Sequence, residues 1–251
     1  MSTFWQLFEE NEAERRAFSS LAVAWESGGE QINDNGMSRL TRCMVGDKYY
    51  YVKAYKKRGR RLRRRIGRSR VRAEWENVEI IASLGIPTLR LVAYGEENGP
   101  NGRHAGVMVT EEVPNVSDLG MLVETKQLEK HGKLRVAEMM EKLALLVRLM
   151  HQHKFVHRDL HCRNVLVSLG EKVEVYIMDC PAGRQITNPI LAPYLNRTML
   201  KDLACLNRVG KQAFTRTRRL KFYMRYAGLE KLDVEHKTRI RKILAFFKGR
   251  E

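Results

Sequence analysis

The 251-residue sequence predicts an α+β fold, with a five-stranded antiparallel sheet in its first part and mostly helices in its second. Two observations support this prediction. Between residues 28 and 113, short runs rich in β-branched and aromatic residues are separated by turns containing Gly, Asn and Asp, as in antiparallel strands. After residue 114, apolar residues recur at helical spacing. With 43% hydrophobic and 30% charged residues, the chain has ample material for a core.

Residues 1–27 are predicted to form a helical extension of one or two short amphipathic helices packed on the first lobe, because apolar residues are interspersed with charged ones there. Acidic residues near the start and the lack of a sustained apolar run argue against a signal peptide. No apolar run in the sequence approaches the length of a membrane span. We therefore expect a cytoplasmic protein, either soluble or peripheral.

Residues 28–113 are predicted to form the first lobe. Three antiparallel strands are expected over residues 28–55, joined by the turns NDNG and GD. A helix follows over residues 71–84, and Gly85 ends it. The segments GIPTLRLVAYGEE and GVMVTEEV, on either side of the turn-rich ENGPNGRH, supply two further strands and complete the five.

Residues 114–251 are predicted to form a second, mostly helical lobe. The helix over residues 134–151 has an apolar stripe wide enough for a central, buried position. Two β-branched runs, at residues 165–167 and 173–178, are joined by a short turn and indicate a hairpin. Three further helices are predicted at residues 197–214, 215–228 and 234–249, of which the last two are strongly basic.

Polar residues around this hairpin indicate phosphoryl transfer. In FVHRDLHCRN, Asp159 precedes Asn164 by five residues, and Asp179 follows the second hairpin strand. In an ATP-dependent kinase one Asp orients the acceptor hydroxyl, while a downstream Asn and a second Asp hold the Mg²⁺ that bridges the phosphates. The sequence therefore predicts Asp159 as a catalytic residue, Asn164 and Asp179 as metal ligands, and ATP and Mg²⁺ as cofactors. A buried ion-pair cluster is the plainer alternative.

The stretch resembles the protein-kinase-like superfamily, and more narrowly the bacterial lipopolysaccharide core heptose kinases and their Kdo-kinase and InaA-like relatives. The resemblance covers residues 30–226 and implies a bilobal protein-kinase-like fold. HRDLHCRN and Asp179 carry it most strongly, Lys53 and the GIPT segment less so, and the phosphate-binding loop least. After Asp179 the sequence continues CPAGR instead of Phe-Gly, which is consistent with a kinase that is always in its working form.

Lys53, near the end of the third strand, is predicted to contact the α- and β-phosphates, and an exposed strand lysine is the alternative. Glu74 is predicted to pair with Lys53, because in the resembling family an acidic residue directly before a Trp lies in this helix. Glu76 and Glu79 are the alternative partners.

Residues 33–39 occupy the position of the loop that covers the ATP phosphates, but they contain only one glycine, Gly36. A plain hairpin turn is an equal alternative. Glu111, Glu112 and Val113 are predicted to form the hinge between the lobes, where the backbone, and not the side chains, would meet the adenine.

Support for the catalytic loop is predicted from two residues. Of the four histidines between residues 151 and 161, only His157 has a role in a kinase, that of bracing this loop, and their spacing does not match a zinc-ligand motif. Asp202 either holds the loop or is a surface carboxylate. The four cysteines form no CxxC pair and are expected to be reduced.

The net charge of +17 implies an anionic partner. Much of it comes from residues 56–72, KKRGRRLRRRIGRSRVR. This run has no aromatic residues that could stack on bases, so nucleic acid is disfavoured as the partner relative to a phosphorylated glycolipid or an anionic inner-membrane surface.

The resemblance and the charge together imply a sugar kinase that phosphorylates a heptose or an adjacent sugar of the lipopolysaccharide core glycolipid. Two alternatives stay open. One is an atypical protein or small-molecule kinase, which would use the same residues. The other is a pseudokinase that binds RNA or an anionic surface. A requirement for an accessory protein is not predicted in either direction.

Overall fold

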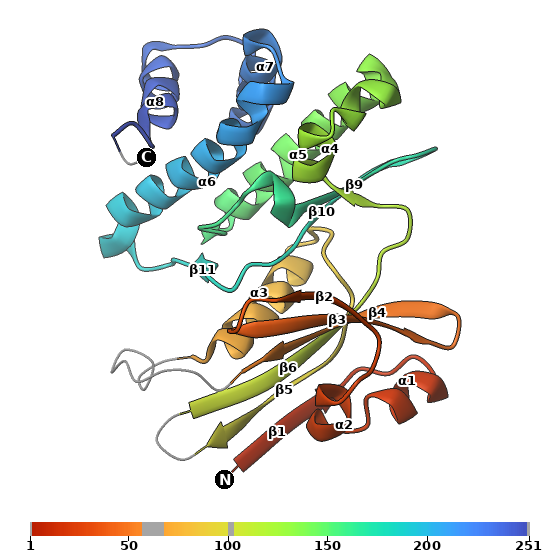
Figure 1. Ribbon diagram of the computed structural model, residues 1–251. Coiled ribbons are helices and arrows are strands. Elements are labelled where there is room, and N and C mark those ends of the chain that lie inside the picture. Colours follow the sequence, from red (N-terminus) through yellow and green to blue (C-terminus); the bar gives the residue numbers. More distant parts are fainter. Residues whose placement is uncertain (1, 57–67, 100–102, 250–251) are drawn as a thin grey trace. The chain divides into compact units, whose positions relative to one another are not determined.

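The computed structural model describes residues 2–56, 68–99 and 103–249 (Figure 1). The chain divides into two compact units. Unit 1 comprises Met1–Glu79 and Leu89–Pro114, and unit 2 comprises Ile80–Thr88 and Asn115–Glu251. Residues 57–67, which make up most of the basic run identified in the sequence, lie outside the described residues. The mixture of helices with an antiparallel sheet confirms the predicted α+β class.

Unit 1 is built around a six-stranded sheet with the order β1-β5-β6-β4-β3-β2, in which every neighbouring pair is antiparallel (Figure 1). The predicted strands are present as β2 to β6, and the sheet has one strand more than expected. The strands are β1 Ser2–Leu7, β2 Glu30–Asp34, β3 Ser38–Val45, β4 Lys48–Tyr55, β5 Leu91–Gly99 and β6 Arg103–Glu111.

The additional strand corrects the prediction of a purely helical extension over residues 1–27. Strand β1 pairs with β5 over its whole length, and only then do the helices α1 (Glu12–Ala17) and α2 (Leu21–Trp25) follow. The side chains alternate as a strand requires: Phe4 contacts Tyr94 on one face, and Trp5 packs into the core of the other. The apolar residues of this short segment fit the spacing of a strand as well as that of a helix. Pairing with the open edge of β5 therefore decides that the segment forms a strand.

The two faces of this sheet are covered by different helices. On one face, Phe18, directly after α1, and Ala24 of α2 join a core with the inward residues of the central strands. On the other face, Trp75 of α3 (Arg70–Ser83) stacks on Tyr94, with ring centroids 4.4 Å apart. Helix α3 ends where Gly85 adopts a φ of +73°, which fits the predicted end of this helix.

Unit 2 consists mainly of helices, with short strands between them. Strands β10, β9 and β7 form a three-stranded sheet, and β11 pairs with β8. Three 3₁₀ helices also occur among the described residues of this unit, at Gln127–His131, Cys162–Asn164 and Pro189–Leu191. The remaining elements are β7 Ser117–Asp118, α4 Leu119–Glu124, α5 Gly132–Gln152, β8 Phe155–Val156, β9 Val165–Leu169, β10 Val173–Ile177, β11 Arg184–Gln185, α6 Ala192–Ala213, α7 Arg216–Ala227 and α8 Val234–Ala245.

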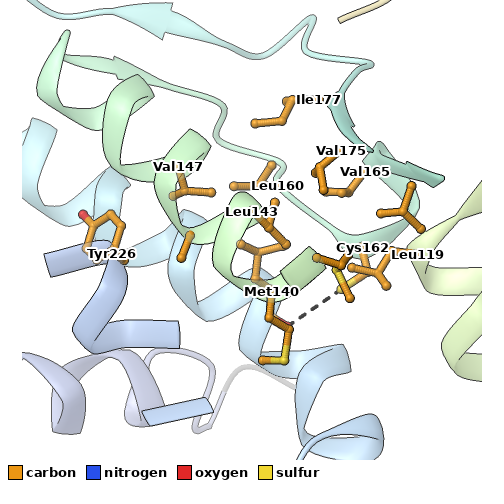
Figure 2. Packing of buried hydrophobic residues seen from close by; sticks show 14 of the residues in the cluster. Leu119, Met140, Leu143, Val147, Leu160, Cys162, Val165, Val175, Ile177 and Tyr226 are labelled. Atoms are coloured by element: carbon orange, nitrogen blue, oxygen red, sulfur yellow. Dashed lines mark hydrogen bonds between the residues drawn. The ribbon is translucent and has the colours of Figure 1, made fainter. Parts of the chain in front are cut away.

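Helix α5 is the centre of unit 2, as its apolar stripe predicted. Figure 2 shows Leu143 and Val147 of this helix among buried residues of the β9-β10 hairpin and the loop before it, and Tyr226 of α7 belongs to the same cluster. The hairpin strands alternate between buried and half-buried residues, so one face of the hairpin joins the core. Burial of this continuous apolar surface is the main term that stabilises the unit.

Capping residues mark both ends of the basic helix α7 and the start of the basic helix α8. Thr215 and Asp233 cap the first turns of α7 and α8 with their side-chain oxygens, and Gly228 ends α7 at a φ of +71°. In the part of the chain that the structure describes, no helix combines the length and apolarity that a bilayer crossing needs.

The central position of α5 predicts a large difference between two methionines of unit 2. Met150 is fully buried and Met121 is 42% exposed. We expect Met150→Ala to lower the free energy of unfolding by about 2–5 kcal/mol, because it leaves a cavity in the core. Met121→Ala should change it by less than about 0.5 kcal/mol. Urea unfolding of the two variants measures both values, and equal losses would contradict the assignment of the core.

Candidate active site

Lys53 and Glu74 form a close ion pair within unit 1. The Lys53 Nζ lies 2.8 Å from Glu74 Oε1, and the Glu74 side chain is only 2% exposed while that of Lys53 is 20% exposed. A carboxylate at this depth requires a charged or hydrogen-bonding partner, since an uncompensated buried charge is costly. The pair therefore fixes the lysine ammonium at one place on β4.

The two alternative glutamates have other partners. Glu76 binds Arg68 and Arg72 at 2.7 and 2.8 Å, and Glu79 accepts a hydrogen bond of 3.0 Å from Tyr94. Burial tends to raise the pKa of Glu76, but the hydrogen bonds from Arg72 and Arg68 outweigh it and the pKa falls. Of the three glutamates that the sequence offered for Lys53, the structure brings Glu74 to it.

The turn around Gly36 uses its own backbone donors. Asp34 Oδ1 accepts from the Gly36 N–H, and Asn35 Oδ1 accepts from the N–H groups of Met37 and Ser38, all at 3.0 Å. Gly36 has a φ of +71°, which glycine adopts without strain. These are the hydrogen bonds of a compact hairpin turn. Gly36 as a phosphate-binding residue therefore stays a prediction, and in this geometry its N–H is already bonded.

The predicted hinge begins at the end of β6. The backbone N–H of Glu111 donates to the Arg90 carbonyl at 3.0 Å, and that of Glu112 donates to the Tyr49 carbonyl at 2.8 Å. The Glu112 carboxylate accepts from Arg42 Nη2 at 2.9 Å, and this hydrogen bond holds the pKa of Glu112 below its usual value. The backbone N–H groups of Glu111 and Glu112 are thus both bonded inside unit 1. Hydrogen bonds to adenine would therefore depend on the Glu111 carbonyl and on the backbone of Val113.

Asp202 of α6 holds the loop that contains the HRD sequence in unit 2. Its side chain is fully buried, and its two oxygens accept from the backbone N–H groups of His157 and Arg158 at 2.8 and 2.7 Å. The prediction that Asp202 holds this loop is therefore confirmed, and the alternative of a surface carboxylate is wrong. His157 also braces the loop, since its Nε2 lies 3.0 Å from the Met178 carbonyl and donates to it.

His151 extends this network in a way that the sequence analysis missed. Its Nε2 lies 3.3 Å from Asp202 Oδ2 and its Nδ1 lies 2.8 Å from the Tyr226 hydroxyl. An ionised carboxylate only accepts, so Nε2 carries the proton and Nδ1 accepts from Tyr226. Burial raises the pKa of Tyr226 to about 12, which keeps this hydroxyl protonated. The signal available in the sequence was a histidine on the buried stripe of α5.

Asp159 itself is open to solvent. Its side chain is 54% exposed, and the Nε2 of His161 lies 3.0 Å from its Oδ1. Its backbone carbonyl accepts from Asn164 Nδ2 at 2.8 Å. This bond occupies the amide nitrogen of Asn164 and leaves the amide oxygen as the atom for a ligand contact. His161 is a second histidine near the site to which the sequence analysis gave no role.

Two residues of the site have strained backbones. Arg158 and Asp179 have φ values of +67° and +55°, which cost a non-glycine residue about 1–3 kcal/mol. Hydrogen bonds hold both in place: Met178 N, directly before Asp179, donates to the Asn164 carbonyl at 3.0 Å. The Arg158 guanidinium donates to the Ala182 carbonyl at 3.1 Å, and Lys201 donates to the Arg158 carbonyl. Strain that is held in this way is typical of functional sites.

Asn164 and Asp179 match the chemistry of a magnesium site. Both are half-buried, and they supply an amide and a carboxylate oxygen, the ligand types that Mg²⁺ prefers. Unit 2 thus links the predicted catalytic residue and both predicted metal ligands through hydrogen bonds of the loop. Unit 1 holds the Lys53 ion pair.

Comparison with known proteins adds two findings. The model of the family described as lipopolysaccharide kinase (Kdo/WaaP) matches residues 23–226. Among solved structures, one described as WaaP in complex with acyl carrier protein matches with a TM-score of 0.73 and 22% sequence identity. The match covers 98% of this chain and 97% of that chain, so the fold is that of WaaP over nearly its whole length.

The Asp202 hydrogen bonds predict a graded loss of stability. Asp202→Ala leaves one buried and one partly buried N–H group without their acceptor and should lower the free energy of unfolding by about 2–4 kcal/mol. Asp202→Asn keeps one acceptor oxygen and should cost less. The same Asp→Asn change at Asp233, an exposed helix cap, should be nearly neutral, because Asn caps equally well. Urea unfolding gives the three values, and a neutral Asp202→Ala would contradict this role.

Proposed function

Because this chain belongs to the lipopolysaccharide kinase (Kdo/WaaP) family, we propose that it transfers the γ-phosphate of ATP to a heptose, or to an adjacent sugar, of the lipopolysaccharide inner core. The observation that carries the proposal is the loop held by Asp202, which exposes Asp159 and whose Asn164 binds the Asp159 carbonyl and the N–H of Met178, the residue before Asp179. Asp159 is available to an acceptor, because it is the exposed carboxylate of a loop whose backbone is fixed.

Each residue has one task in this reaction. Asp159 would accept a hydrogen bond from the acceptor hydroxyl, orient it toward the γ-phosphorus and take its proton. Lys53, held by Glu74, would place its ammonium against the α- and β-phosphates. Asn164 and Asp179 would hold Mg²⁺, which neutralises phosphate charge when bound. The protein thus contributes mainly positioning and charge.

The acceptor follows from the family and from charge. The family name specifies lipopolysaccharide, and the net charge of +17 fits a phosphorylated glycolipid at the cytoplasmic face of the inner membrane. A protein or small-molecule kinase would use the same residues and differs only in its acceptor. A pseudokinase that binds RNA or an anionic surface would have no use for the strained backbone of Asp179.

We also propose that the protein has a protein partner, an acyl carrier protein, as the WaaP structure has. The supporting observation is a cavity of about 550 Å³ in unit 2, a size typical of ligand pockets. Apolar side chains of α5, α6, α7 and α8 line most of it, among them Met140, Leu203, Phe222 and Ile243. A cavity lined in this way suits a fatty acyl chain.

Positively charged side chains lie beside this cavity and would suit an anionic group attached to the acyl chain. Lys211, Arg216 and Arg219 are among its lining residues. A second hollow of about 300 Å³ contains Arg208, Lys211 and Lys248 and shares lining residues of α6 and α8 with the cavity. An acyl carrier protein presents its acyl chain on a phosphate-containing arm, so an apolar cavity beside a cationic hollow matches both parts.

The proposed reaction is tested by replacing Asp159. We expect Asp159→Asn to lower kcat for phosphate transfer from ATP to purified truncated core glycolipid by about 10²- to 10⁴-fold, because the acceptor proton loses its base. Glu171→Gln, an exposed change on the turn of the β9-β10 hairpin, should leave kcat unchanged. Equal rates for wild type and Asp159→Asn would refute the role of Asp159. Transfer by wild type to a peptide or aminoglycoside, and to no glycolipid, would instead favour the alternative acceptors.

The proposed partner is tested by filling the cavity. Met140 is 8% exposed and lines the cavity, whereas Leu134, on the same helix, is 87% exposed. Met140→Trp should weaken binding of a long-chain acyl carrier protein by about tenfold or more, and Leu134→Trp should not. Calorimetry with acylated and unacylated carrier measures this. Equal affinity of wild type for the two carrier forms would show that the cavity does not take the acyl chain.

A further inference from the structure

The N-terminal segment is closely joined to unit 1, although residues 2–22 lie outside the part of the chain that matches the family, residues 23–226. Strand β1 pairs with β5, and the Phe8 N–H then donates to the Val92 carbonyl at 2.7 Å. Helix α1 follows and carries Glu14, whose side chain is fully buried. A buried carboxylate from a segment beyond the common family region calls for an explanation.

Glu14 accepts hydrogen bonds from three groups. Its Oε2 accepts from the Glu10 N–H at 2.8 Å, and its Oε1 accepts from the Tyr50 hydroxyl at 2.8 Å and from the Arg90 guanidinium. Burial tends to raise the pKa of Glu14, but these hydrogen bonds outweigh it and the pKa falls below its usual value. Glu14 is therefore ionised and compensated in the folded protein.

Arg90 connects Glu14 to the predicted hinge. While one of its guanidinium nitrogens binds Glu14, its Nε donates to the Glu111 carboxylate. Its own carbonyl accepts from the Glu111 N–H at 3.0 Å. Lys48 Nζ binds the other Glu111 oxygen at 2.9 Å and lies 3.6 Å from Glu10. Both the side chain and the backbone of Glu111 are thus held by residues that also contact the N-terminal segment.

The acidic side chains of this network are balanced by cations. Glu10, Glu14 and Glu111 bring one carboxylate oxygen each within 4.8 Å of one another. Three carboxylates at this separation would repel strongly if unpaired. Arg90 contacts all three of them, and Lys48 contacts two. Glu14 is the most deeply buried of the three, and it supplies one of the contacts that set the position of the Arg90 guanidinium.

We propose that the N-terminal segment positions the hinge for nucleotide binding, with Glu14 holding Arg90 and Arg90 holding Glu111. The inference rests on the proposed function, because it takes Glu111 as the first hinge residue. Glu111 is where the backbone would accept from the adenine amino group, and a small rotation of this peptide misaligns that hydrogen bond. Glu14 acts through Arg90 and does not touch the nucleotide, so it is a positioning residue.

The test compares two glutamates of the same helix. Glu14→Gln removes the charge that orients Arg90 and nearly keeps the shape, so we expect the KM for ATP to rise roughly 3- to 30-fold, with kcat changed by less than about threefold. Glu12→Gln is the matched control, since Glu12 is exposed and binds only Arg15 and Arg16 among the described residues. It should leave the KM for ATP as in wild type.

A second measurement separates positioning from stability alone. Calorimetric titration of each folded variant with a non-hydrolysable ATP analogue should show the same loss of affinity for Glu14→Gln. If that variant does not fold, Tyr50→Phe, which removes one donor to Glu14, should give a smaller rise in KM. A folded Glu14→Gln, or a Tyr50→Phe, with wild-type affinity overturns the proposal while the kinase reaction stands. A wild type that binds no nucleotide overturns both.

Discussion

The buried carboxylate of Asp202 is the constraint on which the conformation of the loop that carries Asp159 depends. Two consecutive backbone N–H groups of the loop donate to it, and without this acceptor both would lose their partner, that of His157 in a buried position. Because those two hydrogen bonds are made, the loop can keep Arg158 in a left-handed conformation and expose the carboxylate of Asp159. Helix α6 supplies the carboxylate, and His151 of α5 keeps it in place, so the two longest helices fix the loop.

The same arrangement recurs in unit 1. Glu74 and Glu14 are also almost completely buried carboxylates, and each binds a cation on a strand or beside one, Lys53 and Arg90 respectively. Burying an ion pair is a poor way to gain stability, because desolvation offsets most of the attraction. It does fix the position of a long, flexible cation. In this protein the buried carboxylates therefore serve mainly to fix the positions of cationic side chains and of backbone N–H groups.

Much of the fold and of the candidate site could be predicted from the sequence, because the residue motifs and the spacing of apolar residues indicated the same strands and helices. Among the described elements, helix α3 comes next after the strand of Lys53, which limits the partner of Lys53 to a few glutamates of one helix. The prediction was wrong for β1, because the apolar residues around Gln6 fit the spacing of a strand as well as that of a helix, and the open edge of β5 is a tertiary feature. His151 was missed for a similar reason, since its partners Asp202 and Tyr226 are 51 and 75 residues away.

The pairing of β1 with β5 also affects how the chain can fold during synthesis. Ser2 lies opposite Asn98, so β1 finds its neighbour β5 only when nearly a hundred further residues have been synthesised. Until then β1 is an unpaired apolar strand, the kind of segment that chaperones bind and that aggregates when left exposed. Closing so long a loop is slow, so the amino-terminal strand is expected to dock late, after the hairpins of β2 to β4 have formed locally.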